Sequence, residues 1–366
     1  MVSHRLKIDR FFLFSVGALT CVGFVIFLSA SLGLLTQDGV SFGTVAIKQI
    51  ISLCIGVCAF FVFSHVKYTY LRKSALFIFI AAIAINLLLF IPSLSLFHGG
   101  AARWINIGPL SFQPSEFLKI AFIIYLATWI QFVKDKISQL KFGLVPYLVI
   151  SAILGGLLLA QSDTDTFLII TSTGVVMLLV AGMPIKHMAL AGIALALVVV
   201  GVVMLRPYAY QRVQTFLSGN SDARGAGYQI NQSLITIGSG GVSGRGFGQS
   251  VQKFGYLPQP TDDSIFAVAG EEFGFIGSSL LVILYILVAA SAFRIASKSP
   301  DIFGGMVAVG IGILIITESF LNMSAMLGLI PLSGVPLLFV SHGGTALIII
   351  LAATGIVANI SKYSKS

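Results

Sequence analysis

One stretch, residues 206–263, interrupts an otherwise apolar chain and reads RPYAYQRVQTFLSGNSDARGAGYQINQSLITIGSGGVSGRGFGQSVQKFGYLPQPTDD. It is rich in glycine and carries five basic side chains: Arg206, Arg212, Arg224, Arg245 and Lys253. Hydrophobic runs of roughly bilayer length precede and follow it. The stretch therefore separates two groups of candidate membrane spans, and polar chemistry is expected within it.

The composition excludes a soluble domain. Of the 366 residues, 57% are hydrophobic and only 10% are charged, whereas soluble domains have about 25% charged residues. The net charge of +9 does not predict a nucleic-acid partner, because the charges lie between apolar runs rather than on one basic face. We expect a polytopic membrane protein in which residues 11–35 form the first span rather than a cleaved signal.

Ten apolar runs predict an all-α fold with about ten transmembrane helices. They lie near residues 11–35, 44–64, 75–97, 113–132, 143–160, 166–182, 187–205, 263–292, 303–326 and 343–360. Residues 327–342 are apolar too, but two prolines and a glycine predict a re-entrant or surface-lying loop there. Within the long stretch, residues 227–237 predict a short amphipathic helix at the interface.

The distribution of basic residues predicts the orientation. With ten spans, the two termini share a side, and fourteen of the 22 lysines and arginines fall on that side. Seven fall on the other, five of them in the long loop, and Lys119 lies within a span. The positive-inside rule then predicts cytoplasmic termini and an extracytoplasmic loop at 206–262. Five basic residues on the outer side favour an anionic partner, although long loops also translocate regardless of charge.

Two acids close the long loop, Asp262 and Asp263, at the mouth of the next span. One of them can cap the helix, and a carboxylate at an apolar boundary can serve as a general base. Arg103 lies in another loop on the predicted outer side. Glu116 and Lys119 are three residues apart in the fourth span, so they either neutralise each other or contribute to binding.

Four motifs resemble those of the SEDS family, whose branches are FtsW, RodA and SpoVE. They are RWINIGPLSFQPSEFLK (103–119), GYQINQSLITIGSGG (227–241), YLPQPTDDSIFAVAGEEFGFIG (256–277), and GLIPLSGVP (328–336) with SHGG (341–344). The resemblance covers nearly the whole chain. It implies a single transmembrane domain over residues 1–366, with 206–262 as its large extracytoplasmic loop. Residues 248–258 are more similar to the division branch, FtsW, than to RodA.

The resemblance implies a peptidoglycan glycosyltransferase of the bacterial cytoplasmic membrane, which polymerises lipid II at the outer leaflet beside a class B penicillin-binding protein. The family's catalytic aspartate falls on Asp263. Asp262 stands where the family has threonine, so either aspartate remains a candidate. Asp165 replaces a glycine of the family pattern, Glu318 a glutamine and His342 a tyrosine; a lone histidine is more often structural than catalytic.

On this hypothesis Asp263 takes the proton of the acceptor sugar, and undecaprenyl pyrophosphate leaves. Positive charge would come from Arg103, Arg212, Arg245 and Lys253, with Lys119 deeper. Further binding residues are expected at Glu116, Asp262, Ser341 and His342. A divalent cation, Mg or Mn, is a further expectation for which the sequence shows no ligand set. Two alternatives stay open: a flippase or transporter of the lipid-linked precursor, and a non-catalytic scaffold for the penicillin-binding protein.

Overall fold

The computed structural model describes residues 7–36, 42–98, 101–107, 110–217 and 226–364. Its first half contains α1 (Arg10–Ser31), η1 (Leu32–Thr36), α2 (Phe42–His65), α3 (Thr69–Leu87), η2 (Leu88–Phe90), β1 (Ser95–His98), β2 (Ala101–Ile107), β3 (Leu110–Phe112), α4 (Pro114–Phe132), η3 (Lys134–Lys136), α5 (Leu144–Ala160) and α6 (Thr164–Val180). Then follow α7 (Ile185–Leu205), α8 (Pro207–Leu217), α9 (Ala226–Ser239), α10 (Ile265–Ser297), α11 (Ile302–Met326) and α12 (Gly344–Ser361).

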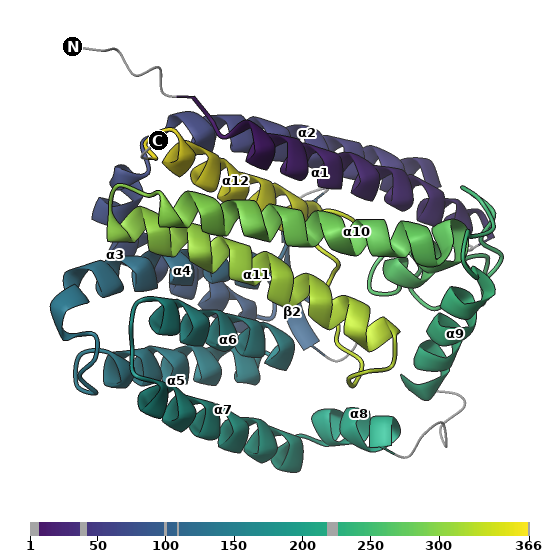
Figure 1. Cartoon of the computed structure of the whole chain (residues 1–366). Coiled ribbons are helices and arrows are strands. Elements are labelled where there is room, and N and C mark those ends of the chain that lie inside the picture. Colours follow the sequence, from purple (N-terminus) through teal and green to yellow (C-terminus); the bar gives the residue numbers. More distant parts are fainter. Residues whose placement is uncertain (1–6, 37–41, 99–100, 108–109, 218–225, 365–366) are drawn as a thin grey trace.

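The predicted multi-pass helical architecture is confirmed. Among the residues described, eight helices are long and apolar enough to cross a membrane, and α5 and α6 are shorter apolar helices. The long helices run side by side, with both chain ends at one end of the bundle (Figure 1). There the backbone N–H of Asp9 donates to Ser361 Oγ at 3.0 Å, and Arg294 Nη2 pairs with Asp9 Oδ1 at 2.8 Å. We call the opposite end, where α8 and α9 lie, the loop face.

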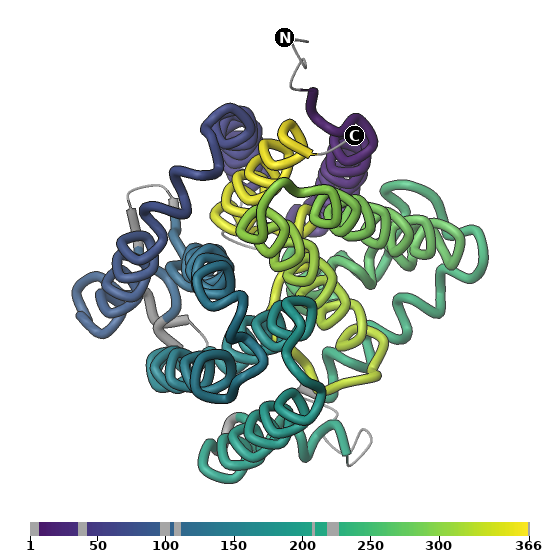
Figure 2. Tube along the Cα trace, turned by 60° about the vertical axis from the view of Figure 1, so that its left-hand side comes forward, coloured from purple at the N-terminus to yellow at the C-terminus, as the bar shows by residue number. Residues whose placement is uncertain are grey.

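The centre of the bundle is α11, which packs against α10, α4 and α6 (Figure 2). In its most apolar stretch 78% of the residues are buried, against 17% in α7 at the periphery. On the other side α12 packs along α2, and α1 packs along α10. The wide apolar surface left on the outer helices fits a hydrocarbon surrounding.

The third span differs from its prediction of 75–97. The helix α3 begins earlier, at Thr69, so Arg72 and Lys73 lie in its first turns. Long basic side chains tolerate this position because their charged ends can extend beyond the apolar layer. The helical path ends at Phe90 because Pro92 disfavours helix at the preceding Ile91, whose φ and ψ are −89° and 111°.

A small antiparallel sheet follows the third span, where the sequence predicted only a loop. Its strand order is β1-β2-β3; Ser95 lies opposite Ile105, which also lies opposite Phe112. The sheet pairs backbone groups that neither helix nor lipid would satisfy. Its middle strand, β2, carries Arg103 and packs against α4.

The long loop contains two helices. The helix predicted for residues 227–237 is confirmed as α9, and α8 was not predicted. Arg224, one of its basic residues, lies outside the described residues. The segment 327–343 has no helix, as predicted. Its irregular backbone is tied to the bundle, where the Tyr285 hydroxyl donates to the Leu338 carbonyl.

The helix α10 is interrupted at Gly274, and there its backbone bonds to loop residues 241–246. We call this contact the joint. Gly274 has φ 63° and ψ −163°, a conformation that is essentially restricted to glycine. The break frees backbone groups that a continuous helix would pair internally. Four bonds to the loop satisfy them: Arg245 N–H to Glu271 O (3.0 Å), Gly246 N–H to Glu272 O (2.9 Å), Phe275 N–H to Gly241 O (2.9 Å) and Ile276 N–H to Val242 O (3.1 Å).

A buried ion pair reinforces this joint. Lys253 is fully buried, and its Nζ lies 2.7 Å from Glu272 Oε1 and 3.1 Å from Ser29 Oγ of α1. The Ser29 hydroxyl also donates to the Glu272 carboxylate at 2.6 Å. Loop, α10 and α1 thus share one hydrogen-bonded cluster, and removing one partner would leave a buried charge unpaired.

We expect Gly274→Ala to destabilise the protein strongly. Its β-carbon would lie 2.3 Å from the backbone nitrogen of Gly244, and the conformation alone costs about 1–3 kcal/mol. Gly156→Ala in α5 is the matched control, because nothing lies within 4 Å of its added β-carbon. Thermal unfolding in detergent should show a lower midpoint for Gly274→Ala only. Equal unfolding midpoints for the two variants would show that the bundle tolerates a side chain at Gly274, contrary to the contacts described above.

Candidate functional site

Asp263 lies in the turn before α10, with a partly exposed side chain. Its backbone carbonyl accepts a hydrogen bond of 2.8 Å from Asn322 Nδ2, which also donates to the Val335 carbonyl at 2.9 Å. Asn322 is fully buried on α11. One amide group therefore fixes the aspartate turn relative to the segment 327–343.

The turn itself is held by Gln259, whose positive φ of 47° is strained for a residue other than glycine. Its carbonyl accepts the backbone N–H groups of Asp262 and Ser264, each at 3.2 Å. The Ser264 hydroxyl in turn accepts from Gln229 Nε2 of α9 at 3.0 Å. The amphipathic helix thus supports the turn that carries Asp263.

The environment of Asp263 suits a proton acceptor. Burial raises the pKa of its carboxyl to about 7, and the negative charges of Asp262 and Asp165 act in the same direction. Arg212 and Arg103 oppose the rise in pKa because they favour the ionised form. A carboxyl with this pKa can take up and release a proton near neutral pH.

Two arginines reach the same place from different elements. Arg103 of β2 donates to the Ser162 carbonyl, and its Nη1 lies 3.9 Å from Asp163 Oδ1. Arg212 of α8 pairs through Nη1 with Asp165 Oδ2 at 3.3 Å. The α5–α6 turn and the first turn of α6 therefore supply a carboxylate for each guanidinium.

Gly334 marks the point where these groups converge. A β-carbon on it would lie 3.7 Å from Arg212 Nη2, 3.9 Å from Arg103 Nη1 and 4.0 Å from Asp263 Oδ2. Its own N–H donates to Asp165 Oδ2 at 3.2 Å. We call these five residues the Asp263 site. The Asp263 carboxylate and both guanidinium groups therefore lie within 4.0 Å of one point, the position of a β-carbon on Gly334.

Next to the Asp263 site, Asp262 contacts Ser341 and His342. The Ser341 hydroxyl donates to the Asp262 carbonyl at 2.7 Å and accepts from the Leu337 N–H at 2.8 Å. His342 Nδ1 lies 3.5 Å from Asp262 Oδ1, and the imidazole stacks on Phe27 with 5.9 Å between ring centres. The structure thus places Ser341 and His342 against Asp262, where they tie the segment 327–343 to the aspartate turn.

Glu116 and Lys119 are buried within α4 and pair with each other at 2.9 Å. Lys119 Nζ also lies 2.5 Å from Glu318 Oε2 of α11. The ammonium group therefore links two central helices. Among the described residues, the Lys119 ammonium group pairs with these two carboxylates.

Arg245 and Lys253 belong to the joint at the broken helix rather than to the Asp263 site. Arg245 is partly exposed, with its Nε 3.4 Å from Glu271 Oε1. Lys253 is enclosed with Glu272. Both charges are engaged by acids of α10 in this conformation.

The sequence suggested a divalent cation, but the described residues contain no ligand set for one. Over the described ranges, no three His, Cys, Asp or Glu side chains converge as a metal site would require. The acids nearest Asp263 are instead engaged with arginines and with His342. Residues of this kind do not fit a dedicated protein-held metal.

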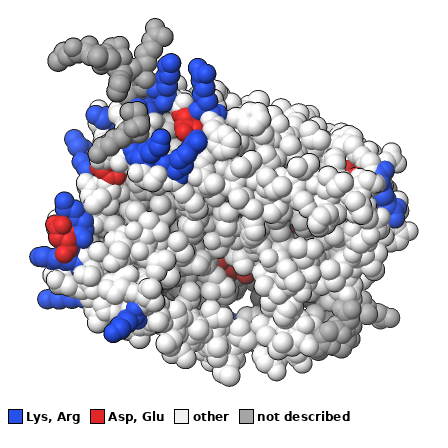
Figure 3. Space-filling model, viewed as in Figure 1, with Lys and Arg blue, Asp and Glu red and all other residues white. Residues whose placement is uncertain are grey.

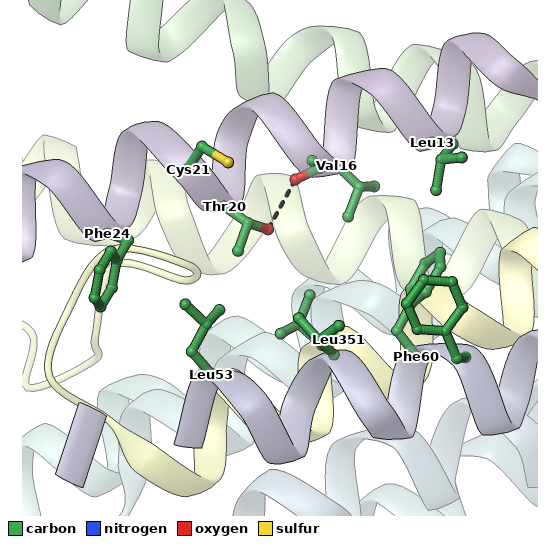
Figure 4. A pocket seen from close by; sticks show the side chains of 11 residues that line it. Leu13, Val16, Thr20, Cys21, Phe24, Leu53, Phe60 and Leu351 are labelled. Atoms are coloured by element: carbon green, nitrogen blue, oxygen red, sulfur yellow. Dashed lines mark hydrogen bonds between the residues drawn. The ribbon is translucent and has the colours of Figure 1, made fainter. Parts of the chain in front are cut away.

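A separate apolar cavity of about 290 Å³ lies between α1, α2 and α12. Its lining includes Leu13, Phe24, Leu53 and Leu351 (Figure 4). The hydroxyl of Thr20 is satisfied by the Val16 carbonyl at 2.8 Å. None of the candidate site residues lines this cavity.

The site residues predicted from the sequence did not include Asp165, Gly334 or Gln229. Asp165 carried a usable signal, since two acids two residues apart in a short polar break of an apolar chain are costly. Gly334 carried none, because only the folded chain shows which side chains surround a glycine.

The model of the family FTSW_RODA_SPOVE, described as "Cell cycle protein", matches residues 9–366. Stage V sporulation protein E of Bacillus subtilis is 38% identical over 320 residues, 87% of each chain. The probable peptidoglycan glycosyltransferase FtsW of Geobacter sp. strain M18 is 35% identical over 356 residues, 96% of each chain.

Two solved structures have the same fold. One, described as "Structural coordination of polymerization and crosslinking by a peptidoglycan synthase complex", has a TM-score of 0.80 and 27% identity over 97% of each chain. The crystal structure of the Thermus thermophilus rod shape determining protein RodA has a TM-score of 0.72 and 24% identity over 98% of each chain.

We expect Asp263 to titrate near pH 7, about three units above an ordinary aspartate. NMR of ¹³C-aspartate-labelled protein should show one such carboxyl, whose signal Asp263→Asn removes. Arg212→Gln should move this titration to higher pH, because the guanidinium favours the carboxylate. A titration near pH 4 would contradict the described environment.

Proposed function

We propose, from the premise that this chain belongs to the FtsW/RodA/SpoVE family, that it is a peptidoglycan glycosyltransferase which polymerises lipid II into glycan strands. Relatives that match almost its whole length are named probable peptidoglycan glycosyltransferases. The observation that carries the mechanism is the convergence of Asp263, Arg103 and Arg212 above Gly334. Such a site combines a proton acceptor with the positive charge that a diphosphate requires.

In the proposed reaction, the 4-hydroxyl of the acceptor sugar attacks the anomeric carbon of the lipid-linked donor. The new bond joins that oxygen to the anomeric carbon, while the bond from the anomeric carbon to the diphosphate oxygen breaks. Asp263 takes the hydroxyl proton, and the electron pair of the broken bond leaves with undecaprenyl pyrophosphate. A carboxyl whose pKa is about 7 suits this role near neutral pH.

Arg103 and Arg212 are assigned to the leaving diphosphate. Guanidinium groups bind phosphate oxygens with paired donors, and charge that develops as the bond breaks is stabilised by cations held in position beforehand. A diphosphate leaves without protonation, so the site needs no second carboxyl as general acid, unlike a glycosidase. No step is assigned to a metal ion.

The remaining predicted substrate-binding residues receive supporting roles in this proposal. Arg245 is partly exposed and is the candidate for a peripheral contact with substrate. Lys253, with Glu272, positions the loop, and Lys119, paired with Glu116 and Glu318, joins α4 to α11. Asp262, Ser341 and His342 hold the aspartate turn against the segment 327–343.

The proposed orientation follows from charge. Lysines and arginines gather over the end of the molecule that carries the chain ends, while the middle of the visible face is largely uncharged (Figure 3). The positive-inside rule supports cytoplasmic termini. The loop face and Asp263 would then meet lipid II at the outer leaflet of the bacterial cytoplasmic membrane.

The proposed partner is a class B penicillin-binding protein, which would cross-link the new strands. The similar solved structure described as a peptidoglycan synthase complex for polymerization and crosslinking supports this pairing. The relatives named FtsW, together with the loop residues 248–258, support a role in cell division.

Asp263→Ala should abolish polymerisation of lipid II by the purified protein in liposomes, a loss of at least about 100-fold. Asp262→Ala is the matched control and should retain most activity, because the bond from Ser341 that holds the turn uses the backbone carbonyl of Asp262, which alanine keeps. Strand length on gels would be measured for both. Loss of activity in Asp262→Ala alone would move the base to its neighbour.

Gly334→Leu should block polymerisation while the protein still folds. A β-carbon at this position has only ordinary contacts, of 3.7 Å or more, so Gly334→Ala should unfold at the wild-type temperature. A leucine side chain would fill the space between Asp263 and the two arginines. Wild-type polymerisation by Gly334→Leu would show that the substrate does not enter there.

A further inference from the structure

Asp165 makes the connections that close the Asp263 site. It lies in the first turn of α6 with a partly buried side chain. A single oxygen, Oδ2, accepts from Arg212 Nη1 at 3.3 Å and from the Gly334 N–H at 3.2 Å. One carboxylate therefore joins α8 to the segment 327–343.

That segment is attached to Asp263 by an independent route. Asn322 donates both to the Asp263 carbonyl and to the carbonyl of Val335, the residue after Gly334. The position of Gly334 relative to Asp263 is thus fixed from α11 by Asn322 and from α6 by Asp165. Loss of either bond would loosen the same short stretch of backbone.

The charges that act on Asp263 come from several elements of the site. Asp262 precedes it in the chain, Asp165 lies on α6, Arg103 on β2 and Arg212 on α8. His342 faces Asp262. Asp165 alone among them pairs with a site arginine and also acts as a like charge on Asp263.

We propose that Asp165 is a positioning residue for this reaction: its carboxylate holds the Arg212 guanidinium and the Gly334 amide beside Asp263, and its negative charge acts on Asp263 across the same space. This role rests on the proposed function. It concerns a residue at which the SEDS pattern, as described above, has glycine. The negative charge of Asp165 is one of the causes that raise the pKa of the Asp263 carboxyl.

The charge can be removed without changing the shape of the side chain. Asp165→Asn keeps an oxygen that accepts from Gly334 and Arg212, whereas Asp165→Gly removes the side chain. Asp165→Glu retains the charge. Asp135→Asn is the matched control, because Asp135 is exposed in η3, far along the chain from any site residue and beyond the opposite end of α4.

The decisive measurement is the pH dependence of kcat/KM for lipid II polymerisation in liposomes. The wild-type rate should rise with pH as Asp263 loses its proton. Asp165→Asn should move this acidic limb to lower pH by about half a unit or more, because a like charge is gone. Asp165→Glu should restore most of the wild-type limb, and Asp135→Asn should leave it unchanged. A limb that does not move in Asp165→Asn, or moves equally in Asp135→Asn, would overturn the proposal.

The ¹³C titration of Asp263 separates this inference from the proposed function. If Asp165→Asn lowers the pH at which Asp263 titrates but the wild-type protein polymerises no lipid II, the charge coupling stands and the proposed activity fails. If the wild-type protein polymerises lipid II and the Asp263 titration is the same in Asp165→Asn, the activity stands and the role of Asp165 is wrong.

Discussion

The loop face depends on the satisfaction of backbone groups at the break in α10. A helix inside a membrane pairs its N–H and C=O groups internally, and irregular backbone is tolerated only where protein supplies other partners. At Gly274 these partners are the backbone groups of residues 241–246. The loop is thereby bonded into the helix, and its end, the turn that carries Asp263, is fixed relative to the bundle.

Buried charge is handled in two ways in this protein. The side chains of Lys119 and Lys253 are 2% and 0% exposed. Lys119 pairs with Glu116 of its own helix and with Glu318 of α11, and Lys253 of the loop pairs with Glu272 of α10. Such pairs specify which elements meet. Arg103 and Arg212 are 17% and 21% exposed and lie beside the space above Gly334. These two arginines are therefore less enclosed than the two lysines.

The helical framework was predictable because lipid leaves few alternatives to an apolar helix. Ten runs of hydrophobic residues correspond to ten helices, and α9 and the irregular segment 327–343 were predicted as well. The predicted boundaries are wrong where a helix ends before the apolar run that contains it. Pro92 ends α3 within a hydrophobic stretch, and the three short strands that follow have no signal strong enough to distinguish them from a loop.

The sequence by itself determined the class of the protein, its spans and the candidate aspartate, because hydrophobicity and local motifs are properties of neighbouring residues. Only the tertiary structure decided which charges lie beside Asp263. Arg103 and Arg212 meet Asp263, whereas Arg245 and Lys253, equally basic and in the same loop as Arg212, are engaged by Glu271 and Glu272. The physical reason is that a charge acts through the groups that surround it in space, and these come from elements up to hundreds of residues apart.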